Sequence, residues 1–142
     1  VVKTMIIANY FKPNKEQEFE ISGLIGPEYQ WANQLSISQI FCSKMVIHRA
    51  SRELIENFPN RSELVFGTIE IRPGGALIQL SQGDLATAWC IPFHHLSVVK
   101  SECWEIHSNG LCVKLIDPSW SNKNFISILM NHKRSAIEIE MN

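Results

Sequence analysis

Residues 68–81 read TIEIRPGGALIQLS, and this run predicts a β-hairpin. Apolar and polar side chains alternate on both sides of the Pro-Gly-Gly segment, with the period of half-buried strands. Glycine adopts positive φ without a clash at Cβ, so we expect Gly74-Gly75 to form a two-residue turn. That turn places side chains of matching polarity opposite each other, in the pairs Ile71 with Ile78, Ile69 with Leu80, Glu70 with Gln79 and Thr68 with Ser81.

A second hairpin is predicted over residues 102–116, which read ECWEIHSNGLCVKLI. Asn-Gly is the strongest short signal for a tight hairpin turn, and here it is Asn109-Gly110. Closing the strands on this turn creates an apolar face, which we expect to be buried, and a polar face. The apolar face holds the pairs Ile106 with Val113 and Trp104 with Leu115, and the polar face holds Glu105 with Lys114 and His107 with Cys112.

The segment between the hairpins predicts another strand and a corner. Residues 82–84 form a turn, and in residues 85–91 the odd-numbered side chains share one face and the even-numbered ones the other. Pro92 ends this strand because proline has no N–H to donate. Residues 93–96 then make a corner, and residues 97–100 are extended again. A change in the apolar phase at Gly67 predicts a β-bulge. Residues 63–117 as a whole therefore predict an antiparallel meander.

Shorter elements are expected on the N-terminal side of the meander. Met5–Phe11 is apolar enough for a strand, and Glu18–Gly23 alternates like a short strand. Pro27 is suited to open a helix through Glu28–Leu35. Ser38–Phe58 has two interpretations: a helix throughout, or a strand at Ile40–Ile47 followed by a helix over Arg49–Phe58.

An amphipathic helix is expected on the C-terminal side. After a loop over residues 117–122 that holds an N-cap candidate, apolar positions recur at i, i+3, i+4 and i+7. We expect this helix to pack onto the sheet and residues 136–142 to be a frayed tail. The residues on its apolar face are Phe125, Ile128, Leu129 and His132.

Length and composition define the broad class. The chain has 142 residues, of which 45% are hydrophobic and 19% charged, with a formal net charge of -1. This favours one domain over 1–142, with a strand and helix region (1–62), the meander (63–117) and a C-terminal helix and tail (118–142). The predicted fold class is α+β: a strongly bent antiparallel meander or partial barrel, with a preceding helix and a C-terminal capping helix.

Charge, cysteines and hydropathy narrow the expected surroundings. A nearly neutral chain lacks the basic excess that attracts phosphate backbones, so nucleic acid is not an expected partner. The four cysteines form no C-x-x-C pair and no recognisable disulfide framework, so we expect reduced thiols and a cytoplasmic protein. No apolar run approaches the ~20 residues that span a bilayer.

Two places in the sequence could carry chemistry. His94-His95 follows Cys90 at the predicted corner, and a metal could use Cys90 and one of these histidines, with Cys103 or His107 completing the set. The alternative is a polar corner with one half-buried, hydrogen-bonded histidine. The spacing matches no structural zinc signature, so we favour the polar corner and expect no cofactor.

The second place is the predicted cross-strand pair of His107 and Cys112. An imidazolium beside a thiol lowers the thiol pKa and can create a nucleophile. An exposed, rigid sheet face without an oxyanion donor is a poor place for one, so we favour chance adjacency. Trp120, in a loop, is the tryptophan best placed to contact a ligand. No catalytic, cofactor or metal residue is predicted, and the residues to follow are His94, His95, His107, Cys112 and Trp120.

The order of these signals resembles the bacterial pleckstrin-homology-like domains. The resemblance rests on a strand ending Trp89-Cys90-Ile91-Pro92, a corner through Leu96 to Val98-Val99, a closing hairpin and a C-terminal amphipathic helix. It covers roughly residues 63–133. It implies a strongly bent antiparallel barrel with one open end capped by the last helix. It also implies an adaptor, membrane-targeting or oligomerisation module rather than a catalyst. The predicted hairpin loops carry no basic cluster, so we do not expect phosphoinositide binding.

The function expected from the sequence is a non-catalytic protein-interaction or adaptor module, with a sheet edge or the barrel mouth contacting a protein partner. An alternative is a carrier of a small ligand or lipid, with its cavity beneath the last helix. The third hypothesis is a Cys/His metal site or a thiol enzyme. An exposed edge strand would also permit a homo-oligomer through sheet pairing.

Overall fold

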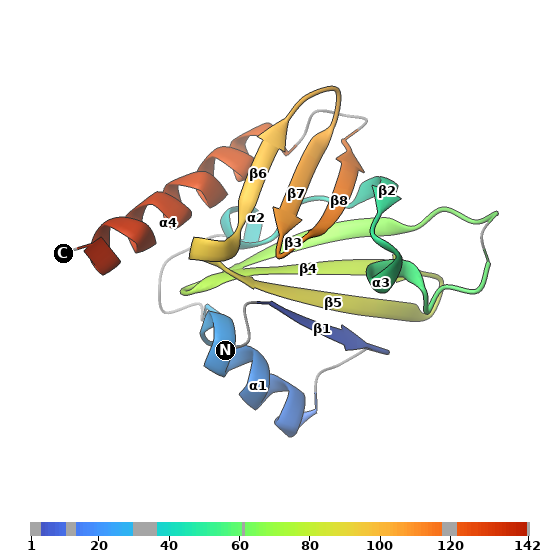
Figure 1. The fold of residues 1–142 in the computed structure, drawn as a ribbon, viewed down its shortest axis with the longest axis horizontal. Helices are drawn as coiled ribbons and strands as arrows, with labels where there is room; N and C mark the ends of the chain where they lie inside the picture. The colour runs from blue at the N-terminus through green and yellow to red at the C-terminus, as the bar shows by residue number, and fades with distance from the viewer. Residues whose placement is uncertain (1–3, 11–13, 30–36, 61, 118–121, 142) are drawn as a thin grey trace.

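The computed structural model describes residues 4–10, 14–29, 37–60, 62–117 and 122–141, and their strands form one antiparallel sheet (Figure 1). The eight strands lie in the order β1-β5-β4-β3-β2-β8-β7-β6. They are β1 (Met5–Ala8), β2 (Met45–Ala50), β3 (Phe66–Arg72), β4 (Gly75–Gln82), β5 (Leu85–Pro92), β6 (Ser97–Lys100), β7 (Trp104–Ser108) and β8 (Leu111–Ile116). The helices are α1 (Lys15–Ile25), α2 (Ile37–Ile40), α3 (Arg52–Ile55), the 3-10 helix η2 (Phe93–His95) and α4 (Lys123–Met141).

The sheet is bent at β2, which pairs with β3 on one side and with β8 on the other. The register of β2 against β8 shifts between Ile47 and Arg49, and such irregularities increase the local twist of a strand. In Figure 1 the strands β6, β7 and β8 stand at a steep angle to β3, β4 and β5. β1 and β6 remain edges, so the sheet does not close into a barrel. The α+β class predicted from the sequence is confirmed.

The first hairpin has a different register from the predicted one. Pro73-Gly74 forms the turn, Arg72 lies opposite Gly75, and Ile69 lies opposite Ile78. Neither Gly74 nor Gly75 has positive φ. Proline presets the φ that a type I or II turn needs at its first central position, and this favours the observed turn over Gly74-Gly75. The shift is two residues along the ladder, so every side chain keeps its predicted face.

The second hairpin is confirmed pair by pair. Ile106 lies opposite Val113, and His107 lies opposite Cys112. Asn109 has φ 53° and Gly110 has φ 80°, the two positive values that a type I′ turn requires. The turn after β4 and the strand end at Pro92 also lie where the sequence predicts them.

The predicted bulge at Gly67 is wrong. Gly67 pairs with Leu80 in an unbroken ladder between β3 and β4. A Cβ at this position would lie 2.7 Å from Leu115 Cδ2 and 2.9 Å from Ile47 Cδ1. The side chains of Leu115 and Ile47 therefore pack onto the backbone of β3 at Gly67, and a Cβ here would require their ends to shift.

The N-terminal region is helical where a strand was expected. Residues 18–23 lie within α1, which begins with a capping box between Asn14 and Gln17. Ile21 and Ile25 are buried one helical turn apart, whereas Phe19 is 81% exposed. The helical period of Ile21 and Ile25, rather than the alternation of Phe19 and Ile21, therefore defines the buried face of this segment. β1 confirms the first predicted strand over residues 5–8.

The ambiguous segment 38–58 contains a strand between two short helices. β2 at Met45–Ala50 and α3 at Arg52–Ile55 are closer to the strand-then-helix interpretation than to one continuous helix. Residues 27–29 are not helical, and the rest of the helix expected over Glu28–Leu35 lies outside the described residues.

α4 confirms the predicted C-terminal helix and corrects its end. Phe125 and Leu129 are buried, whereas the expected frayed tail is helical through Met141. Buried Asn122 holds the start of α4 to the segment before β2. Its Oδ1 accepts from the Ser43 N–H at 2.7 Å, and its Nδ2 donates to the Ser43 carbonyl at 3.0 Å.

We expect Asn122→Ala to reduce the free energy of unfolding by about 1–3 kcal/mol, because it leaves two backbone groups of Ser43 without their partner. Urea denaturation followed by circular dichroism measures the loss. Ser127→Ala, on the exposed side of the same helix, is the control and should change stability by less than about 0.5 kcal/mol. Equal stability of the two variants would contradict this role for Asn122.

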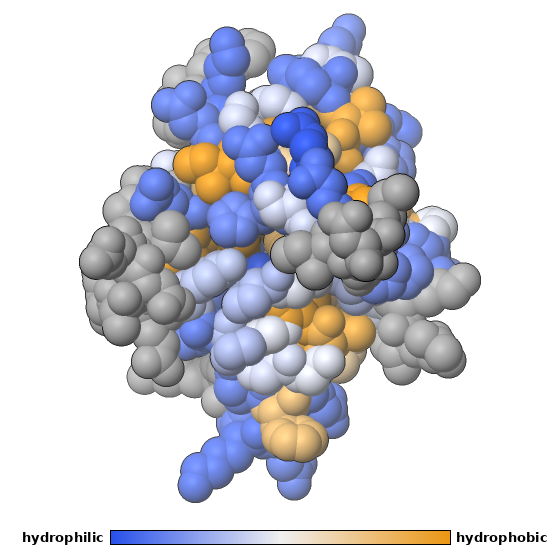
Figure 2. Space-filling model, turned by 90° about the vertical axis from the view of Figure 1, so that its left-hand side faces the viewer, coloured by the Kyte–Doolittle hydropathy of each residue, from blue (hydrophilic) through white to orange (hydrophobic). Residues whose placement is uncertain are grey.

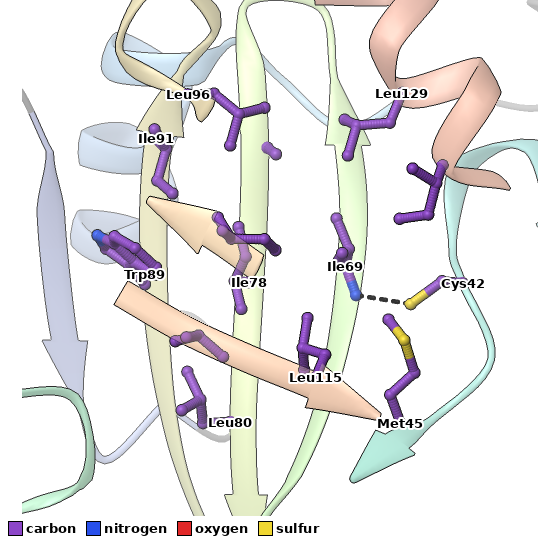
Figure 3. Packing of buried hydrophobic residues seen from close by; sticks show 14 of the residues in the cluster. Cys42, Met45, Ile69, Ile78, Leu80, Trp89, Ile91, Leu96, Leu115 and Leu129 are labelled. Atoms are coloured by element: carbon purple, nitrogen blue, oxygen red, sulfur yellow. Dashed lines mark hydrogen bonds between the residues drawn. The ribbon is translucent and has the colours of Figure 1, made fainter. Parts of the chain in front are cut away.

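Alternate side chains of the central strands enter two separate apolar clusters. Trp89 and Ile91 face the main core between the two halves of the sheet, whereas Ala88 and Cys90 face α1. Figure 3 shows the main core, in which Leu129 from α4 and Leu115 from β8 meet the side chains of β3, β4 and β5. The two faces predicted for residues 85–91 are confirmed. α4 thus covers one end of the bent sheet, and α1 covers the outer face beside β1.

Candidate functional site

A pocket of about 350 Å³ lies at the end of the bent sheet where α4 packs. We call it the mouth pocket. It is lined by the turn at Pro73-Gly74, by Phe93 and His94 of η2, and by α4 between His132 and Ile137. Figure 2 views this end of the molecule, where apolar patches lie among hydrophilic side chains.

The histidine of α4 is held in a half-buried position beside an aromatic ring. The centroids of the His132 and Tyr29 rings are 6.1 Å apart, and the planes are tilted by 60°. Burial lowers the pKa of His132, because desolvation disfavours the imidazolium. Lys133, the next residue, donates from Nζ to the carbonyl of Leu96. α4 is therefore fixed to the corner that forms the opposite wall of the pocket.

The two histidines of the corner have separate environments. His94 is exposed at the mouth pocket, and His95 is half-buried. Their rings are 4.1 Å apart between centroids. Cys90 points the other way, into the apolar cluster beneath α1, where burial raises its thiol pKa to about 12. The structure therefore does not assemble the Cys90 and histidine set that the metal hypothesis required.

A different trio does come together, on the outer face of the β7-β8 hairpin. His107 Nε2 lies 3.1 Å from Glu105 Oε1 and 3.7 Å from Cys112 Sγ. The potential metal-ligating atoms of these three residues all lie within 4.8 Å of one another. Among the described residues, they form the group of His, Cys and acidic side chains that is close enough to hold a metal ion. We call it the hairpin trio. The sequence predicted the pair of His107 with Cys112 but not the addition of Glu105.

The electrostatics of the hairpin trio do not activate the thiol. Burial, followed by the charge of Glu105, raises the pKa of Cys112. Hydrogen bonds from Ser101 and His107 lower the pKa of Glu105. A carboxylate therefore competes with the thiol for the imidazole and keeps the thiol protonated, which argues against a nucleophilic cysteine.

Arg72 is fully buried, and its guanidinium contacts carboxylates from three parts of the chain. Its nitrogens lie 2.7 Å from Glu70, 3.0 Å from Glu18 and 3.5 Å from Glu28. Arg72 also donates to the carbonyl of Gly26 at 3.2 Å. The cation is therefore used to hold α1 and the segment after it against β3. No signal in the local sequence pattern indicates this arrangement.

The remaining sequence candidates are located as follows. Trp120 lies outside the described residues, so its expected ligand contact stays a prediction. All four cysteines are free thiols. Among the described helices, none has both the length and the apolar character needed to cross a bilayer. No protein-family model matches this chain, and searches of curated proteins and of solved structures gave no similar protein.

Proposed function

We propose that this protein is a non-catalytic interaction module that binds a short segment of a protein partner in the mouth pocket. The observation that carries the proposal is the composition of this pocket. Phe93, Ala136 and Ile137 supply apolar surface, and His94, His132 and Ser135 supply hydrogen-bonding groups. Pockets of this kind anchor apolar side chains and orient them through a few polar contacts.

The charge of the pocket favours a neutral occupant. Its described lining contains no carboxylate, ammonium or guanidinium group. The imidazole of His132 is kept neutral by burial, and it can both donate and accept a hydrogen bond. An apolar side chain flanked by backbone amides offers the complementary chemistry.

The size of the pocket favours a peptide side chain over a large lipid. At about 350 Å³ it is near the lower end of the ~300–1,000 Å³ usual for ligand sites. This volume accommodates one or two anchor side chains. The alternative function, a carrier of a small ligand, is supported by the position of the pocket under the C-terminal half of α4.

The proposal also agrees with the resemblance to pleckstrin-homology-like domains. The bent antiparallel sheet and the helix at one end of it support this resemblance, but the sheet stays open where the resemblance implies a barrel. β1, α1, α2, β2 and α3 lie outside the stretch that carries the resemblance. A homo-oligomer through an exposed sheet edge stays a prediction.

Filling the pocket is expected to abolish partner binding. Peptides selected from a random library against the intact protein would be measured by calorimetry with the parent chain and with Ala136→Trp. The indole occupies the pocket, so affinity should fall at least ~100-fold, the loss of a main anchor. Asn131→Trp adds the same ring on the exposed side of α4 and should leave affinity unchanged.

Three outcomes would contradict the proposal. Peptides that bind Ala136→Trp as tightly as the parent chain do not use the pocket. A small molecule that co-purifies in native mass spectrometry, and is lost from Ala136→Trp, would favour the carrier function. Turnover of an esterase, phosphatase or nuclease substrate that is lost in His107→Ala or Cys112→Ala would show an enzyme.

A further inference from the structure

We propose that the hairpin trio of Glu105, His107 and Cys112 is a binding site for a divalent transition metal, with zinc as the metal that fits best. The site lies on the outer face of β7 and β8, and the proposal is independent of the mouth pocket. The ligand atoms are Glu105 Oε1, His107 Nε2 and Cys112 Sγ.

The two separations measured from His107 Nε2 are close to those of a tetrahedral zinc site. Zinc bonds of ~2.3 Å to sulfur and ~2.0–2.2 Å to nitrogen or oxygen imply ligand–ligand distances of roughly 3.4–3.6 Å. The observed separations are 3.7 Å between His107 and Cys112 and 3.1 Å between His107 and Glu105. The ligand atoms of Glu105 and Cys112 lie within 4.8 Å of each other, so metal binding would draw these two side chains closer together.

The backbone holds these ligands in place before any metal binds. His107 and Cys112 are directly opposite each other beside a type I′ turn, and Glu105 is two residues along the same strand. Ser51, the residue that follows β2, fixes the backbone of Cys112. Its Oγ accepts from the Cys112 N–H and its own N–H donates to the Cys112 carbonyl, each at 2.8 Å.

A second group orients the carboxylate. Ser101 Oγ donates to Glu105 Oε2 at 2.7 Å, which leaves Oε1 directed toward the imidazole. Such outer contacts fix the orientation of metal ligands and commonly affect metal affinity. Hydrogen bonds with Ser51 and Ser101 therefore hold Cys112 and Glu105 in place, in addition to the closeness of the three ligand residues on one surface.

The ligand types select the metal. Thiolate and imidazole favour zinc and cobalt over magnesium and calcium, which prefer oxygen ligands. Three protein ligands leave a fourth position for water or another molecule. Lys114 lies opposite Glu105, and Arg49 lies opposite Lys114 on the adjoining strand, so two cations oppose metal binding. We therefore expect weaker binding than in closed four-ligand sites.

Binding is expected to release a proton, so affinity should increase with pH. The Cys112 thiol must ionise to bind a metal. The charged or titratable groups around it are His107, whose Nε2 lies 3.7 Å from Cys112 Sγ, and Glu105, Lys114 and Cys103. Calorimetry in buffers of different ionisation enthalpy measures the number of protons released.

The test is titration of the intact, reduced protein with cobalt(II). Binding should produce a thiolate-to-cobalt charge-transfer band and the intense visible bands of tetrahedral cobalt, and zinc should displace both. Cys112→Ser should remove the charge-transfer band. His107→Ala and Glu105→Gln should weaken affinity at least ~10-fold, and Ser101→Ala by roughly 10-fold, the range for outer-contact changes.

Two controls distinguish this site from incidental binding. His48→Ala removes an exposed histidine of β2, and Cys103→Ser removes a nearby thiol outside the trio; both should bind cobalt like the parent chain. Lys114→Gln should bind more tightly. The proposal is overturned if the charge-transfer band persists in Cys112→Ser, if Cys103→Ser abolishes it, or if the correctly folded parent chain shows no such band at millimolar cobalt.

Discussion

A Gly75→Ala variant is expected to lose about 3 kcal/mol or more of its free energy of unfolding, the upper range for overpacking. A Cβ at residue 75 would lie 2.2 Å from the carbonyl oxygen of Ile91 and 2.6 Å from Ile25 Cγ2. Ile91 belongs to the neighbouring strand β5, so the nearer atom is backbone and cannot rotate away. The substitution must separate β4 from β5 beside the mouth pocket.

Chemical denaturation of Gly75→Ala and Gly23→Ala provides the comparison. Gly23 is in α1, and a Cβ there would meet no atom within 4 Å. Because alanine is the better helix former, Gly23→Ala should stabilise the protein by up to ~1 kcal/mol. If Gly75→Ala is as stable as the parent chain, then β4 and β5 do not approach each other as described.

Arg72→Met is expected to reduce the free energy of unfolding by about 3–5 kcal/mol, the usual cost of breaking a buried ion pair. Methionine fills much of the same space but removes the cation between α1 and β3. Glu70, whose side chain is only 10% exposed, then loses its nearest counter-charge. Thermal or urea denaturation at neutral pH measures the loss.

The pH dependence of Arg72→Met identifies the cause. Burial already raises the pKa of Glu70 above its ordinary 4.5, and Arg72 opposes this shift. In the parent chain the folded state therefore already binds more protons at Glu70 than the unfolded state, and removing Arg72 enlarges this difference. As the pH rises from about 4.5 to 7, the stability of Arg72→Met should fall more than that of the parent chain.

A second substitution separates charge from packing. Arg72→Met/Glu70→Leu removes both charges of the pair and should recover part of the lost stability. Two results together would show that packing rather than charge explains the loss. The double variant would be less stable than Arg72→Met, and the stability of Arg72→Met would depend on pH in the same way as that of the parent chain.

The hairpin trio could be predicted from the sequence as far as it depends on the β7-β8 hairpin alone. The Asn109-Gly110 turn sets the register of β7 and β8, and this register alone brings His107 and Cys112 together. The diagonal approach of Glu105 was also available from that register, because diagonal neighbours on one sheet face are within reach of long side chains. The mouth pocket was not predictable in detail, because η2, α4 and the turn at residue 73 meet only in three dimensions.

Local pattern was sufficient for the features that depend on neighbouring residues: the two faces of β5, the strand end at Pro92 and the apolar face of α4. It failed where distant segments meet. Ile47 and Leu115 pack onto Gly67 at the bend, and Arg72 pairs with glutamates of α1 and of the segment after it. Spacing along the chain determines which face a side chain occupies, but only packing between remote segments determines what that face contacts.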